Sequence, residues 1–220
     1  MDWTAMWVTG KLAMWTTGVL LVFGLPLSYW LATTRWPWKF LVEAVVALPL
    51  ILPPTVLGFY ILLATGTNSP LGRAVESLTG TRLPFTFSGI LLGSALFNLP
   101  FAVWPFTSAF KAVDRNLVEA SWCLGVSRLA TFFRLTVPLS WPGILTGLVL
   151  TFFHSVGEFG VVLMVGGNIP GVTRTLSIAV YDDVQALNYA SAGQASLLLV
   201  ASSFVALCLV YGFQRRVLPL

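Results

Sequence analysis

Five long stretches of the chain are almost free of charged residues, and short polar or charged segments separate them. Each stretch reaches the roughly 20 apolar residues that an α-helix needs to cross the hydrocarbon core of a bilayer. The predicted spans are Leu12–Leu31, Ala44–Ala64, Phe87–Phe110, Leu139 to about Val165, and Ala192–Phe213. The pattern therefore predicts an all-α membrane protein with about five transmembrane helices.

Two of the predicted spans contain several prolines. The second span holds Pro49, Pro53 and Pro54, and the third holds Pro100 and Pro105. An interior proline removes a helix hydrogen bond and kinks the helix, and irregular backbone inside a membrane is tolerated where protein or a water-filled cavity covers it. We therefore expect two bent helices beside a translocation path. Bent helices that only pack together are the alternative.

The basic residues divide unevenly between the two sides that five spans create. One side receives eight of the twelve, namely Arg35, Lys39, Lys111, Arg115, Arg128, Arg134, Arg215 and Arg216. Because cytoplasmic loops are enriched in Lys and Arg, this distribution predicts an N-terminus outside the cell and a C-terminus in the cytoplasm. Residues 114–138, between the third and fourth spans, then form the longest cytoplasmic loop.

The composition supports this class of protein. Of the 220 residues 57% are hydrophobic and only 9% are charged, whereas about a quarter are charged in soluble domains. The net charge of +4 is scattered along the chain, which argues against a nucleic-acid partner. Cys123 and Cys208 imply neither a disulfide framework nor a metal cluster. Residues 1–220 are predicted to form a single transmembrane domain.

The loop 114–138 has the pattern of one amphipathic helix or of two short ones. Asp114 is typical of a helix start and Pro138 of a helix stop. One helical face would carry Val118, Trp122, Val126, Leu129 and Phe133. Such an apolar ridge suits a helix that lies on the membrane surface, and it also suits docking to another protein.

Small side chains in this loop favour docking. The run Glu119-Ala120-Ser121, followed by Gly125 and by Leu135-Thr136-Val137-Pro138, resembles the EAA motif of the permease subunits of ABC importers. In that family Ala is usual at the third position and Ile-x-Leu-Pro at the end, so Ser121, Leu135 and Val137 are conservative departures. The resemblance implies that Glu119, Ala120, Ser121, Gly125 and Pro138 couple this chain to a separate ATPase.

The resemblance extends over nearly the whole chain. "LPLILPPTVLGFYILL" and "SVGEFGVVLMVGGNIPGVTRTLSIAVYDDVQ" are similar to the molybdate importer permeases of that family, and sulfate and tungstate permeases share part of the second stretch. The resemblance implies the type I ABC importer permease fold in the cell inner membrane. It also implies a second copy of this chain, two ATP-binding cassette ATPase subunits that use ATP and Mg²⁺, and an extracytoplasmic molybdate-binding protein. No cofactor is expected in this chain.

The resemblance and the irregular spans together single out two further groups of residues. We expect the translocation pathway or gate to include Pro53, Pro54, Thr55, Ser155, Gly157 and Glu158. We expect the outer loop, with the docking site for the binding protein, to include Asn168, Pro170, Gly171 and Arg174.

Two ionisable residues lie inside the fourth predicted span, His154 and Glu158. Glu158 could hydrogen-bond the glycine-rich turn that follows it, line a watery mouth of the pathway, or carry a proton. A carboxylate repels an oxyanion, so the hydrogen-bonding role is favoured. A catalytic or metal site at His154 would need further ligands at suggestive spacing, and we expect no metal site.

No phosphate-binding loop of the G-x-x-x-x-G-K-[ST] type occurs in the sequence. We therefore expect a transport subunit that is not an enzyme by itself and takes its energy from a partner. Three alternatives remain: a sulfate or tungstate importer permease, an ATPase-independent, proton-coupled anion transporter that uses Glu158 and His154, and a non-transporting membrane scaffold.

Overall fold

The computed structural model describes residues 2–217, and every regular element within them is a helix. The helices are α1 (Trp3–Thr33), α2 (Lys39–Ile51), α3 (Pro54–Thr65), α4 (Pro70–Thr79), α5 (Phe87–Lys111), α6 (Arg115–Cys123), α7 (Arg128–Thr131), a π-helical turn (Phe132–Thr136), α8 (Val137–Val156), α9 (Gly160–Gly166), α10 (Leu176–Gln185) and α11 (Tyr189–Val217). Four helical stretches are long and apolar enough to cross a membrane, and the bent pair α2 and α3 supplies a fifth if it counts as one span. The prediction of an all-α protein with about five spans is confirmed.

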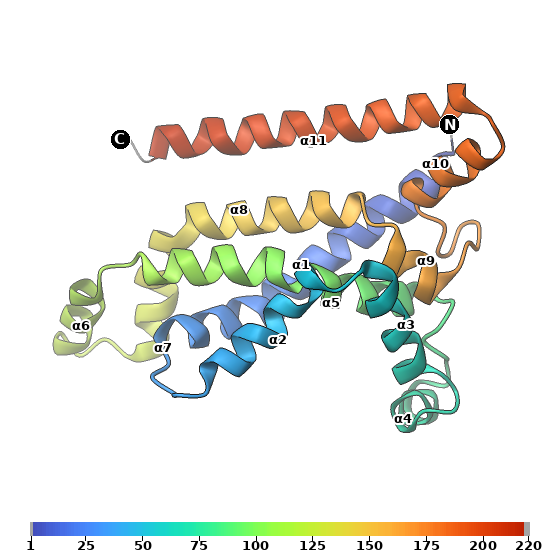
Figure 1. The fold of residues 1–220 in the computed structure, drawn as a ribbon. Coiled ribbons are helices and arrows are strands. Elements are labelled where there is room, and N and C mark those ends of the chain that lie inside the picture. The colour runs from blue at the N-terminus through green and yellow to red at the C-terminus, as the bar shows by residue number, and fades with distance from the viewer. Residues whose placement is uncertain (1, 218–220) are drawn as a thin grey trace.

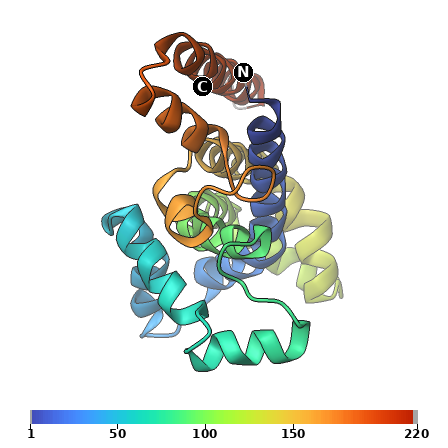
Figure 2. The ribbon, with the colours of Figure 1, turned by 90° about the vertical axis from the view of Figure 1, so that its right-hand side faces the viewer.

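The long helices run lengthwise through the molecule. Figure 1 shows α1, α5 and α8 in the middle, α11 along one side, α6 and α7 at one end, and α4, α9 and α10 at the other. Figure 2 places α3 and α4 on the side opposite α10 and α11. Because α1 starts at the α10 end and α11 runs toward the α6 end, the fold agrees with termini on opposite sides. Which side is cytoplasmic stays a prediction.

One part of the core forms where α5 and α8 approach closely. Phe106 and Ile144 are at most 1% exposed there. A Cβ atom on Gly143 would lie 2.5 Å from the Cβ atom of Ala109, and one on Gly147 would lie 2.6 Å from a ring carbon of Phe106. Small residues let helices approach within a membrane, and at these two glycines the contact requires it.

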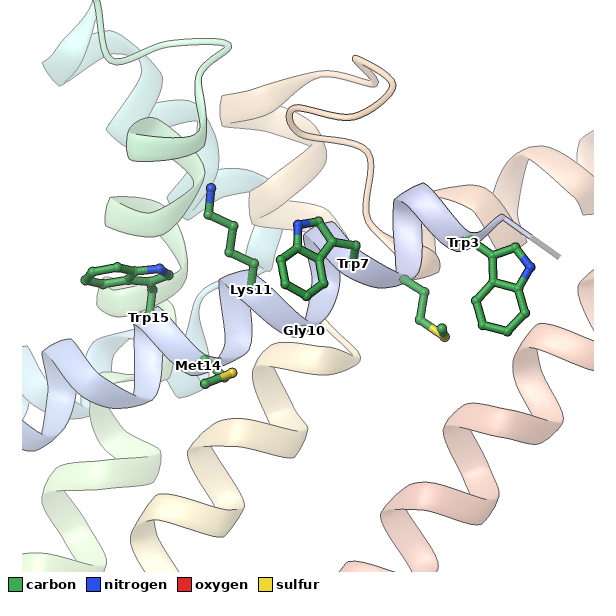
Figure 3. Close-up of a pocket in the computed structure, with 7 residues that line it drawn as sticks. Trp3, Trp7, Gly10, Lys11, Met14 and Trp15 are labelled. Atoms are coloured by element: carbon green, nitrogen blue, oxygen red, sulfur yellow. The ribbon is translucent and has the colours of Figure 1, made fainter.

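The first helix is longer than predicted. It begins at Trp3 rather than at Leu12, because Lys11 interrupts the apolar sequence without ending the helix. Figure 3 shows Lys11 among tryptophans on the first turns of α1, with Trp15 one turn further along. The ammonium group of Lys11 lies 4.3 Å from the centre of the Phe87 ring. A lysine can keep its charge near the polar interface while its stem packs on apolar surface.

The second span is broken rather than kinked. The axes of α2 and α3 are bent by 116° at the break between Ile51 and Pro54. Leu52 and Pro53 have extended backbones, with ψ of 137° and 135°, because a residue that precedes proline is driven away from the helical region. In the third span, by contrast, α5 runs through Pro100 and Pro105 as one helix.

The fourth span ends earlier than predicted. Helix α8 stops at Val156, and a short break separates it from α9, which begins at Gly160. The expectation of one helix reaching about Val165 is therefore wrong. A glycine and a carboxylate next to each other, Gly157 and Glu158, occupy the break. The fifth predicted span lies entirely within α11.

Candidate functional site

The two broken spans meet each other. Pro54, the first residue of α3, packs on Gly160, the first residue of α9: a Cβ atom on Gly160 would lie 2.8 Å from the Cβ atom of Pro54. One turn further along α3, a Cβ atom on Gly58 would lie 2.6 Å from the Cβ atom of Met164. Two short helices that each follow a break in the chain therefore form one tightly packed pair.

The predicted pathway residues divide into an exposed and a buried group around these breaks. The exposed group is Pro53, Pro54, Thr55 and Gly157. Ser155 and Glu158 are 1% and 4% exposed and point into the protein. The structure thus brings all six residues to the region of the breaks, but it buries Ser155 and Glu158 on the α5 side and leaves Thr55 exposed.

Glu158 anchors the break after α8 to the neighbouring helix α5. Its Oε2 atom accepts hydrogen bonds from the Ser94 hydroxyl at 2.6 Å and from the Asn98 amide nitrogen at 3.0 Å. The hydroxyl of Ser94 also lies 2.9 Å from that of Ser155. The carboxylate therefore bonds to α5 and not to the glycine-rich turn that follows it. Its second oxygen, Oε1, has no hydrogen-bond partner among the described residues.

His154 extends this cluster by one more hydrogen bond. Its Nδ1 atom lies 2.9 Å from the Asn98 side-chain oxygen. The amide nitrogen of Asn98 donates to Glu158, so its oxygen is the acceptor, and the His154 ring carries a proton on Nδ1. The ring stacks on Phe101 with centroids 3.8 Å apart. His154, Asn98 and Glu158 thus form a continuous polar chain between α8 and α5.

Sequence reasoning missed Ser94 and Asn98. Both are fully buried in α5, four residues apart, inside an otherwise apolar span. Polar side chains at helix spacing in a membrane span indicate bonding across helices. That signal was present in the sequence, but nothing in it showed that Glu158, some 60 residues later, is the partner.

The outer loop between α9 and α10 is held by an ion-pair cluster. The Asn168 amide donates to Asp182 at 2.8 Å, and the Arg174 guanidinium lies 3.1 Å from the same carboxylate. Arg174 also lies 3.7 Å from Asp2, the N-cap of α1. Two of the four predicted docking residues therefore fasten the loop to α1 and α10.

The other two predicted loop residues lie at its exposed tip. Pro170 and Gly171 are exposed, and Gly171 has φ of 75°, in the left-handed region that glycine favours. The neighbouring apolar side chains Ile169 and Val172 are 39% and 41% exposed. This tip is the part of the loop that is free for contact.

The loop 114–138 forms a helical hairpin at the opposite end of the molecule (Figure 1). Asp114 caps α6 by accepting a hydrogen bond from the Asn116 backbone at 2.8 Å, as predicted. Glu119 pairs with Arg115 at 2.7 Å, and Ala120 is exposed. The loop holds two short helices, so the single continuous apolar face that the spacing suggested does not form.

Gly125 reverses the chain between α6 and α7. Its φ is 79°, and a Cβ atom there would meet nothing within 4 Å. Ser121 holds the two helices together because its hydroxyl lies 2.8 Å from that of Thr131. Gly125 thus suits the left-handed backbone of the turn, and open space surrounds it.

Pro138 does not stop a helix, which corrects the prediction from sequence. The helix runs on from Arg128 to Val156, and the π-helical turn Phe132–Thr136 comes just before the proline. The Val137 backbone nitrogen donates to the Phe132 carbonyl, five residues back. Such a π-turn accommodates a proline by shifting the hydrogen-bond ladder.

Side chains that could bind a metal ion do not cluster in the part of the chain that the structure describes. Within residues 2–217, no three His, Cys, Asp or Glu side chains cluster as a metal site would require. The polar chain of His154, Asn98 and Glu158 contains only two potential metal ligands of these types.

Comparison with known proteins gives one consistent family. The family described as "Binding-protein-dependent transport system inner membrane component" matches residues 24–219. The molybdenum transport system permease protein ModB of Azotobacter vinelandii is 45% identical over 97% of this chain and 95% of its own length. The protein of the same name from Escherichia coli K12 is 35% identical over 84% of this chain and 80% of its own length.

A solved structure supports the fold. The MetNI methionine ABC transporter in an inward facing conformation aligns with a TM-score of 0.73 and 18% identity over 97% of this chain and 94% of the matched chain. This likeness confirms the predicted ABC importer permease fold. The chain belongs to the family of binding-protein-dependent transport system inner membrane components, and it is a multi-pass inner-membrane protein of that family.

Proposed function

We propose that this chain is the permease subunit of an ATP-driven molybdate importer. One observation carries the coupling to a partner: the α6–α7 hairpin extends beyond the long helices and exposes large apolar side chains. Leu124 is 83% exposed, Leu129 69% and Phe133 61%. Several large apolar side chains exposed in one short segment suit a surface that a partner covers. An ABC ATPase, which uses ATP and Mg²⁺, is the partner that the EAA-like sequence of this hairpin favours.

The hairpin is built to transmit movement. Its second half, α7, continues through the π-helical turn into α8 as one stretch from Arg128 to Val156. When the ATPase displaces the hairpin, this continuous helix therefore transmits the displacement to the break at Gly157. Two copies of the chain would place two such helices around a shared pathway.

The paired helices α3 and α9 are our candidate for the gate. Each follows a break in a membrane span, and irregular backbone at membrane depth is tolerated where it lines a protein-covered or water-filled path. Glu158 fixes the α8 side of this pair to α5 through Ser94 and Asn98. Movement of α8 is therefore passed to α5 and to the start of α9 together. The carboxylate acts here as an anchor and not as a ligand for the anion.

The proposed substrate, molybdate, rests on the relatives, which are named as molybdenum transport permeases. The test is uptake of labelled molybdate by vesicles that hold the whole complex with its binding protein, in competition with tungstate and sulfate. Competition by molybdate at the lowest concentration supports the proposal. Strongest competition by sulfate would replace it with a sulfate importer, and strongest competition by tungstate with a tungstate importer.

The exposed tip of the outer loop is the proposed contact for the extracytoplasmic binding protein. Asn168 and Arg174 hold the loop in place through Asp182, while Pro170 and Gly171 present its surface. Pull-down of the binding protein by the purified complex, with and without a Gly171→Asp substitution, tests this contact. Equal recovery with both proteins would place docking elsewhere.

A further inference from the structure

A cavity of about 200 Å³ lies between α1, α2 and α5, at the end of α5 that leads into α6. Its floor is apolar and consists of Leu31, Val46 and Val103, each 2% exposed. Its remaining lining residues are Glu43, Trp104, Thr107, Ser108 and Lys111. An apolar floor under a charged and hydroxylated wall suits an amphiphilic ligand.

The two charged side chains of this cavity, Glu43 and Lys111, form no ion pair with each other. Among the residues whose side chains the structure describes, the ion pairs join Arg82 to Glu76, Arg115 to Glu119, and Arg174 to Asp2 and Asp182. Glu43 and Lys111 take no part in them, although both line one small cavity. The Thr107 hydroxyl beside them is buried without a hydrogen-bond partner in the described part of the chain. A ligand that bears one negative and one positive group would satisfy both charges.

The residues of the cavity suit the level at which a membrane changes from polar to apolar. Lys111 is the last residue of α5, and Trp104 lies seven residues earlier, about 10 Å deeper at the rise of an α-helix. Trp104 is 51% exposed, as is typical of tryptophan at a membrane interface. The charge distribution predicts that this end of the molecule faces the cytoplasm, so the membrane leaflet concerned is the inner one.

We propose that this cavity binds the headgroup of a phosphatidylethanolamine molecule. The phosphate group lies at Lys111 and accepts a hydrogen bond from the Thr107 hydroxyl, and the ammonium group lies at Glu43. The acyl chains pass over the apolar floor and Trp104. A phosphatidylglycerol headgroup has no positive group for Glu43, and neither does a free oxyanion. The site is independent of which anion the protein transports.

Native mass spectrometry of the detergent-purified complex tests this site, with phosphatidylethanolamine and phosphatidylglycerol added at equal concentration. We expect the wild type to retain phosphatidylethanolamine in preference. Glu43→Gln should reduce that preference by about fivefold, the upper range for one partly exposed ion pair. Lys111→Gln should weaken retention of both lipids, and Thr107→Val, which keeps the side-chain shape, should weaken both to a smaller extent.

Two matched variants control for general charge effects. Glu76→Gln removes a carboxylate from α4, and Lys39→Gln removes a positive charge from the start of α2; neither residue lines the cavity. Both should keep the wild-type lipid preference. The proposal is wrong if the wild type retains the two lipids equally, or if Glu43→Gln keeps the wild-type preference. Displacement of the lipid by millimolar molybdate would also overturn it, because the cavity would then belong to the anion pathway.

Discussion

Substitution of Gly58 by alanine tests the packing of the candidate gate. The added Cβ atom would lie 2.6 Å from the Cβ atom of Met164 and 3.2 Å from the Cα atom of Val161. Neither neighbour can be relieved by a side-chain rotation, since both atoms are fixed to the backbone of α9. The substitution therefore forces α3 and α9 apart.

The magnitude follows from the cost of overpacking. Inserting a methyl group into a packed site costs about 1 to 3 kcal/mol, whereas replacing glycine by alanine in a helix gains up to about 1 kcal/mol. Gly18→Ala supplies the matched control, because Gly18 also lies in a helix and its Cβ atom would meet nothing within 4 Å. A change of about 1.4 kcal/mol in the free-energy difference between the open and closed gate alters the ratio of the two populations about tenfold.

Thermal unfolding of the purified complex and ATP-driven uptake are the two readouts. We expect Gly58→Ala to lower the unfolding midpoint by a few degrees and to reduce uptake by about tenfold. Gly18→Ala should leave uptake unchanged and slightly raise stability. Wild-type uptake and stability in Gly58→Ala would refute the tight α3–α9 pair as a functional element.

Three further substitutions address the other parts of the account. Asn98→Ala removes one hydrogen-bond donor from Glu158 and the hydrogen-bond acceptor of His154. The loss of a buried hydrogen-bond partner should lower the unfolding free energy by about 1 to 3 kcal/mol. The surface change Ser77→Ala should lower it far less, and equal losses for the two variants would contradict the anchoring role of Asn98. Gly125→Glu should abolish uptake and co-purification of the ATPase while the protein stays inserted in the membrane. Gly125→Asn should retain uptake and co-purification, because asparagine tolerates the left-handed backbone. Normal co-purification of the ATPase with Gly125→Glu would exclude docking at this turn. Arg174→Ala should release the outer loop and lower the ATP hydrolysis that the binding protein stimulates severalfold. Arg73→Ala, on the same side of the molecule, is the control and should leave this stimulation unchanged. Unchanged stimulation in Arg174→Ala would show that the ion-pair cluster is not needed for transport.

Much of the fold followed from the sequence because membrane spans are set by local composition. The third and fifth predicted spans agree with α5 and α11, and the proline pair at 53 and 54 correctly marked an irregular second span. The start of α1 was misplaced because a lone lysine interrupts the apolar sequence, although a helix near the interface accommodates Lys11. Pro138 was misread because a π-helical turn carries the helix past it.

The site was less predictable because its geometry depends on contacts between distant segments. The sequence identified Glu158 and Pro54 as unusual residues. It did not show that Asn98 donates a hydrogen bond to Glu158 or that Gly160 packs on Pro54. Neither contact leaves a periodic pattern in the chain. The coupling hairpin was easier to locate, since its residues are contiguous, but the turn at Gly125 depends on a backbone conformation that spacing alone does not reveal.

Uptake of labelled molybdate into vesicles with a defined set of subunits tests the central claim most directly. Vesicles that hold this chain with its ATPase, supplied with the binding protein and ATP, should accumulate molybdate. Omission of the ATPase or of ATP should abolish accumulation. Molybdate accumulation by this chain alone, driven by a proton gradient through His154 and Glu158, would contradict the account.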